Sequence, residues 1–257
     1  MAESLEARLR ARRDAGGKAL VPYVTGGVPD WITAADHVAA AGADALEIGI
    51  PFSDPVMDGP VIQAASESAL DAGATPAGIL DQAGRLDVGI PMAAMPYYNL
   101  VFRFGHERFA AGLVAAGFAA AIVPDLPLEE SSDWTAAADD AGVETVLLAA
   151  PTADDDRLAA ICARARGFVY GVGVLGVTGE RQELAASART IAGRLKAVTD
   201  LPVLVGVGIS TPEQAASVCE TADGVVVGSA VVRTLSEKGP EAAAALVGEF
   251  RAALERG

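Results

Sequence analysis

The stretch ALEIGIPFSDPVMDGPVIQ, residues 45–63, joins a strand-like apolar run to a loop that proline and glycine interrupt. It places Glu47 within the apolar run and Asp58 in the loop, eleven residues further on. A carboxylate is costly to bury, so Glu47 is a candidate acid/base residue, with a structural cap or ion pair as the alternative. Asp58 taken alone is typical of a turn, because aspartate before glycine favours turns. The two acids together favour a catalytic pair.

Short β-rich runs recur along the whole chain, and each is followed by an alanine-rich helical stretch. This alternation predicts a parallel sheet with helical crossovers. Eight such units in about 250 residues fit a closed (β/α)8 barrel, the TIM barrel, better than the alternative, a doubly wound sheet. We predict an α/β fold with a single domain over residues 1–257, an N-terminal helix and a short extra helix after the eighth strand. The expected strands cover residues 19–25, 43–50, 88–95, 118–124, 143–150, 167–174, 201–208 and 222–228; the expected helices cover residues 31–41, 60–71, 106–116, 129–141, 154–165, 184–198, 211–220 and 238–255.

The alternation of residues in the second expected strand, residues 43–50, predicts which way the Glu47 side chain points. Alternate residues of a barrel strand point inward, and here one face is small apart from Glu47 whereas the other is mostly bulky and aliphatic. We therefore expect Glu47 to face the barrel centre near the C-terminal end of its strand, where active sites of this fold lie. The same alternation puts Tyr170 on one face of strand 167–174 but does not decide whether that face is inward.

Two glycine-rich turns stand where barrels of this kind bind phosphate. GVGIS, residues 206–210, follows the seventh strand, and GSAVV, residues 228–232, follows the eighth and opens the extra helix. Neither contains a basic residue, and Arg233 is the nearest, so a phosphate would be held by backbone N–H groups, the helix dipole and the Ser229 hydroxyl. The alternative is that the glycines only permit tight turns. A third segment, GVTGE at residues 176–180, is either a lid or an ordinary connection.

Composition excludes several classes of partner. The net charge of −15 argues against nucleic acid and anionic membranes, and no apolar run is long enough to span a bilayer. Cys162 and Cys219 form no disulfide or metal-binding pattern. Residues 1–14 form an amphipathic pattern without the apolar core of a signal peptide, so we expect a cytoplasmic protein.

The positions of lysine and histidine narrow the chemistry further. Lys18, Lys196 and Lys238 all lie away from the C-terminal ends of the strands, which argues against a Schiff-base enzyme. His37 and His106 fall in expected helices, which argues against a histidine-bound metal and against histidine catalysis. We expect neither metal nor cofactor. Carboxylates, a tyrosine and phosphate-binding backbone remain, and they suit general acid/base chemistry on a phosphorylated metabolite.

The chain resembles the tryptophan synthase alpha subunit family along nearly its whole length. The segment LEIGIPFSDP, followed by DGP and a glutamine, is highly specific to that family. The matching pieces are PYVTGGVPD (22–30), LEIGIPFSDPVMDGPVIQAA (46–65), YYNLVF (97–102), VPDLPLEES (123–131), GVTG (176–179), VGVGIS (205–210) and GSAVV (228–232).

This resemblance implies cleavage of indole-3-glycerol phosphate to indole and glyceraldehyde 3-phosphate. The reaction needs neither lysine nor metal, because the indole ring accepts electrons once its C3 is protonated. By resemblance, Glu47 is the acid/base residue, Asp58 accepts a hydrogen bond from the indole N–H, and Tyr170 is the active-site tyrosine. Tyr23 and Leu100 match positions that contact the ring.

The resemblance also assigns residues to the phosphate and to a lid. Asp125 and Thr178 match a pair that links strand four to the lid. A beta subunit in an alpha2-beta2 tetramer would take up the indole, which in such complexes passes between subunits. The residues that match the phosphate cradle are Gly179, Gly208, Gly228 and Ser229.

Some positions depart from the family pattern. Residues 171–175 are more apolar than usual, Met57 replaces a common alanine, and Tyr23 replaces a common phenylalanine. These changes leave two alternatives open: a stand-alone indole-releasing lyase, or a weakly active barrel that mainly activates a partner. A phosphosugar isomerase or epimerase is disfavoured by the absence of histidine and lysine at strand ends.

Overall fold

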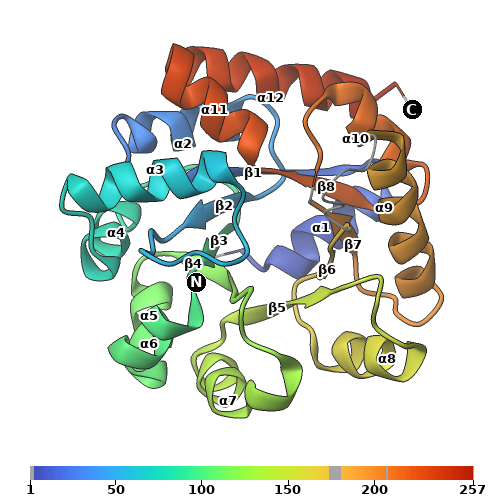
Figure 1. The fold of residues 1–257 in the computed structure, drawn as a ribbon, viewed down its shortest axis with the longest axis horizontal. Coiled ribbons are helices and arrows are strands. Elements are labelled where there is room, and N and C mark those ends of the chain that lie inside the picture. Colours follow the sequence, from blue (N-terminus) through green and yellow to red (C-terminus); the bar gives the residue numbers. More distant parts are fainter. Residues whose placement is uncertain (1–2, 174–180, 207, 257) are drawn as a thin grey trace.

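Eight parallel strands close into a barrel in which each strand pairs with the next along the chain and β8 pairs with β1 (Figure 1). The computed structural model describes residues 3–173, 181–206 and 208–256. The predicted (β/α)8 barrel is therefore confirmed. The strands are β1 (Ala19–Thr25), β2 (Leu46–Gly49), β3 (Met92–Met95), β4 (Phe118–Ile122), β5 (Glu144–Ala149), β6 (Val169–Gly171), β7 (Val203–Val205) and β8 (Gly224–Val227).

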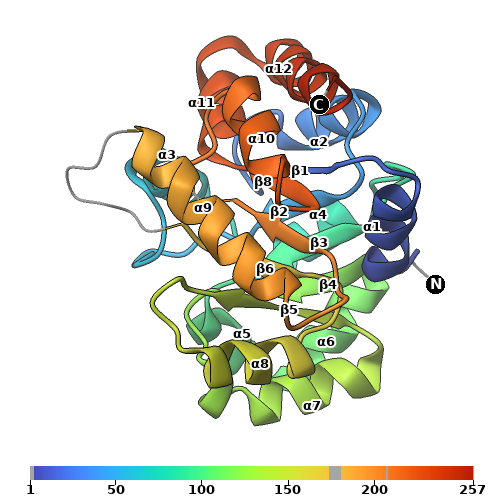
Figure 2. The same ribbon diagram turned by 90° about the vertical axis from the view of Figure 1, so that its right-hand side faces the viewer.

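Helices surround the barrel on its outside (Figure 2). The predicted N-terminal helix is present, and so is the extra helix after β8, which runs for ten residues as α11. Within the part of the chain that the structure describes, no helix combines the length and apolar character needed to cross a membrane. The helices are α1 (Leu5–Asp14), α2 (Trp31–Ala40), α3 (Pro60–Asp71), α4 (Pro76–Ala83), α5 (Tyr98–Phe104), α6 (His106–Ala115), α7 (Ser132–Ala141), α8 (Asp155–Arg164), α9 (Arg181–Lys196), α10 (Pro212–Cys219), α11 (Ser229–Lys238) and α12 (Pro240–Leu254), with a short 3-10 turn at Leu128–Glu130.

The structure corrects several element boundaries. Most of the strands are shorter than predicted, because apolar sequence continues into the loops at both strand ends. The helices α4 and α5 were not predicted. Thr75 caps α4 by accepting a hydrogen bond from the Gly78 N–H, and Pro76 opens it, a start signal that the alanine-rich context obscures. The helix expected over residues 129–141 instead begins as a 3-10 turn and becomes α7 at Ser132.

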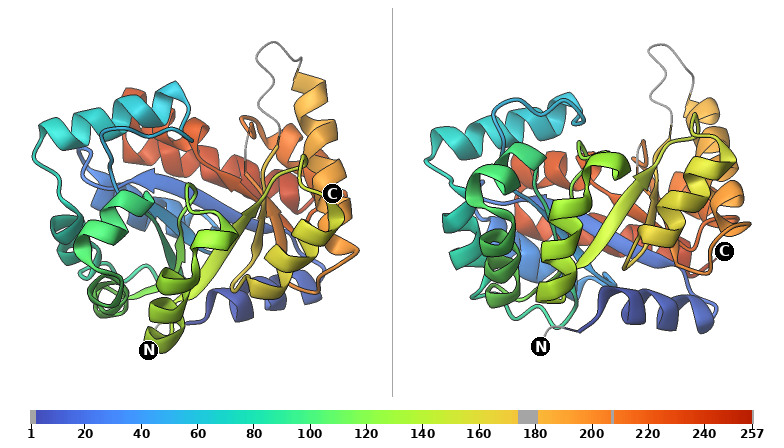
Figure 3. Two further views of the ribbon diagram at one scale, coloured as in Figure 1. Left: turned by 60° about the horizontal axis from the view of Figure 1, so that its bottom comes forward. Right: turned by 90° about the horizontal axis from the view of Figure 1, so that it is seen from below.

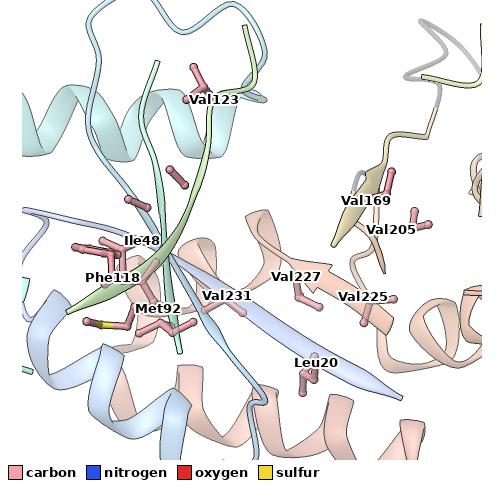
Figure 4. Close-up of a cluster of buried hydrophobic side chains, with 14 of the residues drawn as sticks. Leu20, Ile48, Met92, Phe118, Val123, Val169, Val205, Val225, Val227 and Val231 are labelled. Atoms are coloured by element: carbon pink, nitrogen blue, oxygen red, sulfur yellow. The ribbon is translucent and has the colours of Figure 1, made fainter. Parts of the chain in front are cut away.

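The buried side chains form two layers, one on each side of the barrel wall. The outer cluster lies between the strands and the helices and includes Leu46 and Ile48 of β2; Figure 4 shows part of it around Leu20, Ile48 and Val225. The inner cluster fills the barrel and includes Ala45 and Tyr170. The alternation read from β2 is therefore confirmed, and the face of β6 that carries Tyr170 points inward.

Helix α1 closes the end of the barrel opposite the loop between β2 and α3 (Figure 3). Its Leu5 and Leu9 are buried and belong to the inner cluster. Ser4 caps the helix by accepting a hydrogen bond from the Ala7 N–H, and it donates a 2.5 Å hydrogen bond to Glu144, the first residue of β5. The N-terminal helix thus acts as a plug, which leaves the opposite end for a site.

A buried ion pair joins the C-terminal helix to this closed end. Arg251 of α12 is 9% exposed and pairs with Asp44, which is 6% exposed and precedes β2. Arg251 also donates 2.9 Å hydrogen bonds to the carbonyls of Gly42 and Lys18, and Asp44 accepts a 2.9 Å bond from the Leu20 N–H. One arginine therefore fixes α12 to the starts of β1 and β2.

Candidate active site

Glu47 lies inside the open end of the barrel. Its register partners are Tyr23 on β1 and Ala93 on β3. The residue is 1% exposed, and Oε2 is buried without a hydrogen-bond partner among the described residues. The structural alternative for Glu47, a cap or an ion pair, is not observed in the described part of the chain. An unpartnered carboxyl oxygen in a barrel mouth is free to exchange a proton with a bound molecule.

Burial raises the pKa of Glu47 to about 8, and the negative charge of Asp58 adds to the effect. Both causes penalise the ionised form of the carboxyl group. At neutral pH the group is therefore largely protonated and can donate its proton, which matches the requirement for a general acid.

This raised pKa makes the stability of the fold depend on pH. Between the ordinary value of 4.5 and about 8, the folded protein retains a proton at Glu47 that the unfolded chain has released. Its contribution to the free energy of unfolding is therefore full below 4.5 and is lost as the pH rises through about 8. We expect Glu47→Gln to gain stability relative to the wild type across this window, measured by urea unfolding at a series of pH values. A difference that does not change with pH would contradict the assignment.

The loop that carries Asp58 is held from two sides. Gln63 of α3 donates a 2.8 Å hydrogen bond to the Asp58 carbonyl and a 3.3 Å bond to the Pro55 carbonyl. On the other side, the Tyr97 hydroxyl accepts a 2.9 Å bond from the Met57 N–H. Burial raises the pKa of Asp58, whereas its interaction with the Tyr97 hydroxyl opposes that rise. Asp58 is half-buried, so its carboxylate can accept a hydrogen bond from a ligand.

Two tyrosines complete the mouth, and glycines make room for them. A Cβ on Gly49 would lie 1.8 Å from the Tyr23 hydroxyl oxygen, and one on Gly206 would lie 2.0 Å from that of Tyr170. Only glycine is therefore compatible with either ring position. The pKa of the Tyr170 hydroxyl is raised by burial and by the charges of Glu47 and Asp58, so the catalytic residues predicted from the sequence do lie close together.

The structure describes part of the predicted phosphate-binding site. Gly208 follows β7 with a φ of +84°, a left-handed conformation that favours glycine. Gly228 precedes α11 and Ser229 is its first residue, and no side chain caps this helix end. The first N–H groups of α11 are therefore available to an anion. Thr178 and Gly179, and with them the lid expected at residues 176–180, lie outside the described residues.

The structure also describes Leu100 and Asp125, two other residues assigned by resemblance. Leu100 lies on α5, is partly buried and packs against the outer cluster; its contact with the indole ring stays a prediction. Met95, at the end of β3 and in register with Gly49, packs against the inner cluster. Asp125 accepts a 2.8 Å hydrogen bond from the Tyr98 N–H at the start of α5.

Sequence reasoning missed Met95, Tyr97 and the loop-holding role of Gln63. The period-2 pattern of β3 could have indicated Met95, because it shares a face with Ala93. No local pattern indicates Tyr97, whose contact with the Asp58 loop spans forty residues. Across the described residues, no group of three or more His, Cys, Asp or Glu side chains is arranged to hold a metal ion.

Comparison with known proteins identifies the family. The family model for the tryptophan synthase alpha chain matches residues 9–255. The chain is 44% identical to the tryptophan synthase alpha chain of Gloeobacter violaceus, covering 95% of this chain and 90% of that one. It is also 44% identical to the one from Streptomyces coelicolor, covering 93% and 90%. A structure of Mycobacterium tuberculosis tryptophan synthase has a TM-score of 0.92 at 38% identity and covers 100% of both chains. A fold, a carboxylate pair and a family match thus agree, and the chain belongs to the tryptophan synthase alpha chain family.

Proposed function

We propose that this chain cleaves indole-3-glycerol phosphate to indole and D-glyceraldehyde 3-phosphate, as the alpha subunit of tryptophan synthase in L-tryptophan biosynthesis. The observation that carries the proposal is the Glu47 carboxyl group. It is buried and protonated at neutral pH, and one of its oxygens has no hydrogen-bond partner among the described residues. No other carboxyl in the barrel mouth combines these properties within the described part of the chain.

In the proposed reaction, Glu47 gives up one proton and later takes one back. Protonated Glu47 gives its proton to C3 of the indole ring, which makes the ring an electron acceptor. The bond between C3 and the glycerol chain then breaks, its electron pair returns to the ring, and the adjacent hydroxyl becomes an aldehyde. The proton of that hydroxyl passes to the Glu47 carboxylate, which restores the acid.

In this proposal, Asp58 and the two glycine-rich turns orient the substrate. The Asp58 carboxylate accepts a hydrogen bond from the indole N–H and stabilises positive charge on the protonated ring, as expected for a group aimed at developing charge. Tyr23 and Tyr170 line the ring site. Gly208, Gly228 and Ser229 would bind the phosphate through N–H groups and a hydroxyl, and Thr178 and Gly179 are assigned to the same end by resemblance.

Replacing Asp58 by asparagine should lower kcat by about 10²–10³-fold, the range seen when one preorganised electrostatic contact is removed. Asparagine keeps the size of the side chain and can still accept the indole N–H bond, but it cannot offset the positive charge on the ring. Steady-state kinetics of indole release measure the effect. Asp54→Asn, an exposed acid in the same loop, is the matched control and should behave like the wild type.

The surface beside Asp58 supports a proposed interaction with the beta subunit, in an alpha2-beta2 complex. Val56 is 80% exposed, Met57 is 45% exposed and Phe102 of α5 is 64% exposed. The Met57–Tyr97 hydrogen bond joins the two segments that carry these residues. Exposed apolar side chains next to an active site mark an interaction surface.

Indole release from indole-3-glycerol phosphate tests the proposal, with the purified chain alone and with a beta subunit. Strong activation by the beta subunit supports the complex. High activity of the isolated chain would instead support the stand-alone lyase, and a folded chain that releases no indole in either condition would contradict both. We also propose that residues 1–257 act as one cytoplasmic domain; cell fractionation tests the location.

A further inference from the structure

A cavity of about 650 Å³ lies between α3 and α11, and Glu47 is not among the residues that line it. The two helices pack side by side (Figure 1). The cavity is within the size range of pockets that bind small molecules. Its walls are largely apolar, formed by Val28, Pro60, Val61, Ala64, Val232 and Leu235.

Three charged residues at the rim of this α3–α11 cavity, all exposed to solvent, have no side-chain partner among the described residues: Arg233, Glu237 and Asp30. Arg233 and Glu237 lie one turn apart on α11, yet they form no ion pair. Asp30 stands at the N-cap of α2 with a φ of 59°, and its side chain makes no capping hydrogen bond.

We propose that this cavity binds a hydrophobic α-amino acid as its zwitterion. Its carboxylate pairs with Arg233, its ammonium pairs with Glu237 and Asp30, and its side chain lies against the apolar walls of α3 and α11. Opposite charges one helical turn apart match the neighbouring charges of an α-amino acid. A simple apolar acid would leave the two carboxylates unused, and an apolar amine would leave Arg233 unused.

The position of the cavity couples it to the active site. Helix α3 begins two residues after Asp58, and α11 begins with Ser229 of the proposed phosphate cradle. The helices also meet near that cradle, because a Cβ on Gly228 would lie 3.5 Å from Cδ1 of Ile62. A ligand wedged between them changes the spacing of Asp58 and the cradle, and hence the KM for the substrate. This coupling rests on the proposed function, whereas the binding itself does not.

Calorimetric titration of the full chain tests the binding. The probes are L-phenylalanine, L-leucine and L-tryptophan, with 3-phenylpropionate and phenethylamine as analogues of L-phenylalanine that lack one charge each. We expect at least one amino acid to bind at millimolar concentration or below, and L-phenylalanine to bind about tenfold or more tightly than either analogue, the factor expected for one charge-assisted hydrogen bond. If no amino acid binds, or if 3-phenylpropionate binds as well as L-phenylalanine, the proposal is wrong.

Variants locate the site independently of activity. Arg233→Gln should weaken amino-acid binding about tenfold or more, and Ala64→Phe should abolish binding by filling the cavity. Arg256→Gln removes an exposed arginine near the C-terminus and should leave binding unchanged. Equal binding by wild type and both cavity variants, with folding verified by circular dichroism, would overturn the site. A shift in KM for indole release with bound amino acid supports the coupling; unchanged KM despite binding would overturn the coupling alone.

Discussion

Glu47→Gln is expected to lower kcat for indole release by about 10²–10⁴-fold, the range contributed by a positioned proton donor. Glutamine has nearly the same shape as the protonated carboxyl group, but it cannot deliver the proton to C3 of the indole ring. Substrate binding should change little, because the proposed phosphate contacts lie in the turns after β7 and β8. Steady-state kinetics and an equilibrium binding measurement on the same variant separate the two effects.

The matched control is Glu67→Gln, which removes an exposed carboxyl group on α3 and should leave kcat near the wild-type value. Retained turnover in Glu47→Gln would show that the proton comes from another group. A loss of turnover with an equal loss of binding would assign Glu47 to substrate positioning instead.

Arg251→Met should lower the free energy of unfolding by about 3 kcal/mol, the low end of the range for breaking a buried ion pair, because it leaves the buried Asp44 carboxylate with only Arg12, whose Nε lies 3.8 Å from Oδ1. The same change removes the hydrogen bonds to the carbonyls of Gly42 and Lys18. Methionine keeps much of the side-chain volume, so lost packing contributes little. Urea unfolding at neutral pH measures the difference.

Arg85→Met is the control for this prediction. Arg85, just after α4, forms an ion pair with Asp81 of α4 at an i,i+4 spacing. The two side chains are 72% and 67% exposed. Exposed pairs of this type contribute about 0–1 kcal/mol. Equal losses in the two variants would contradict the account of Arg251.

The sequence was sufficient to predict the barrel fold and the inward orientation of the Glu47 side chain. The alternation in β2 places Glu47 on one face of the strand and Leu46 and Ile48 on the other. An error of one residue in the assignment would have moved every side chain to the opposite face. The short strands follow from hydrogen bonding between neighbours, which no single run of residues reveals. Helix α4 was missed because its start signal, Thr75 and Pro76, lies within sequence rich in alanine and glycine.

The parts of the candidate site that depend on contacts between segments far apart in the chain were harder to predict from the sequence. Tyr97 follows β3, and its hydroxyl accepts a hydrogen bond from Met57 in the loop after the neighbouring strand β2, forty residues earlier in the chain. Leu100 was assigned by resemblance alone, and its contact with the indole ring stays a prediction. By contrast, the charges of Glu47 and Asp58 raise the pKa values of the Tyr23 and Tyr170 hydroxyls in the folded chain, as a shared site requires. Their roles in turnover stay predictions.

The central claim is that Glu47 acts as a protonated acid, and the pH dependence of kcat/KM for indole release tests it most directly. If protonated Glu47 is required, kcat/KM should be level at lower pH and fall by a single-proton slope as the pH rises through about 8, the pKa of the buried carboxyl. A value of kcat/KM that instead increases through the same pH range would show that an ionised group starts the reaction, and would contradict the account.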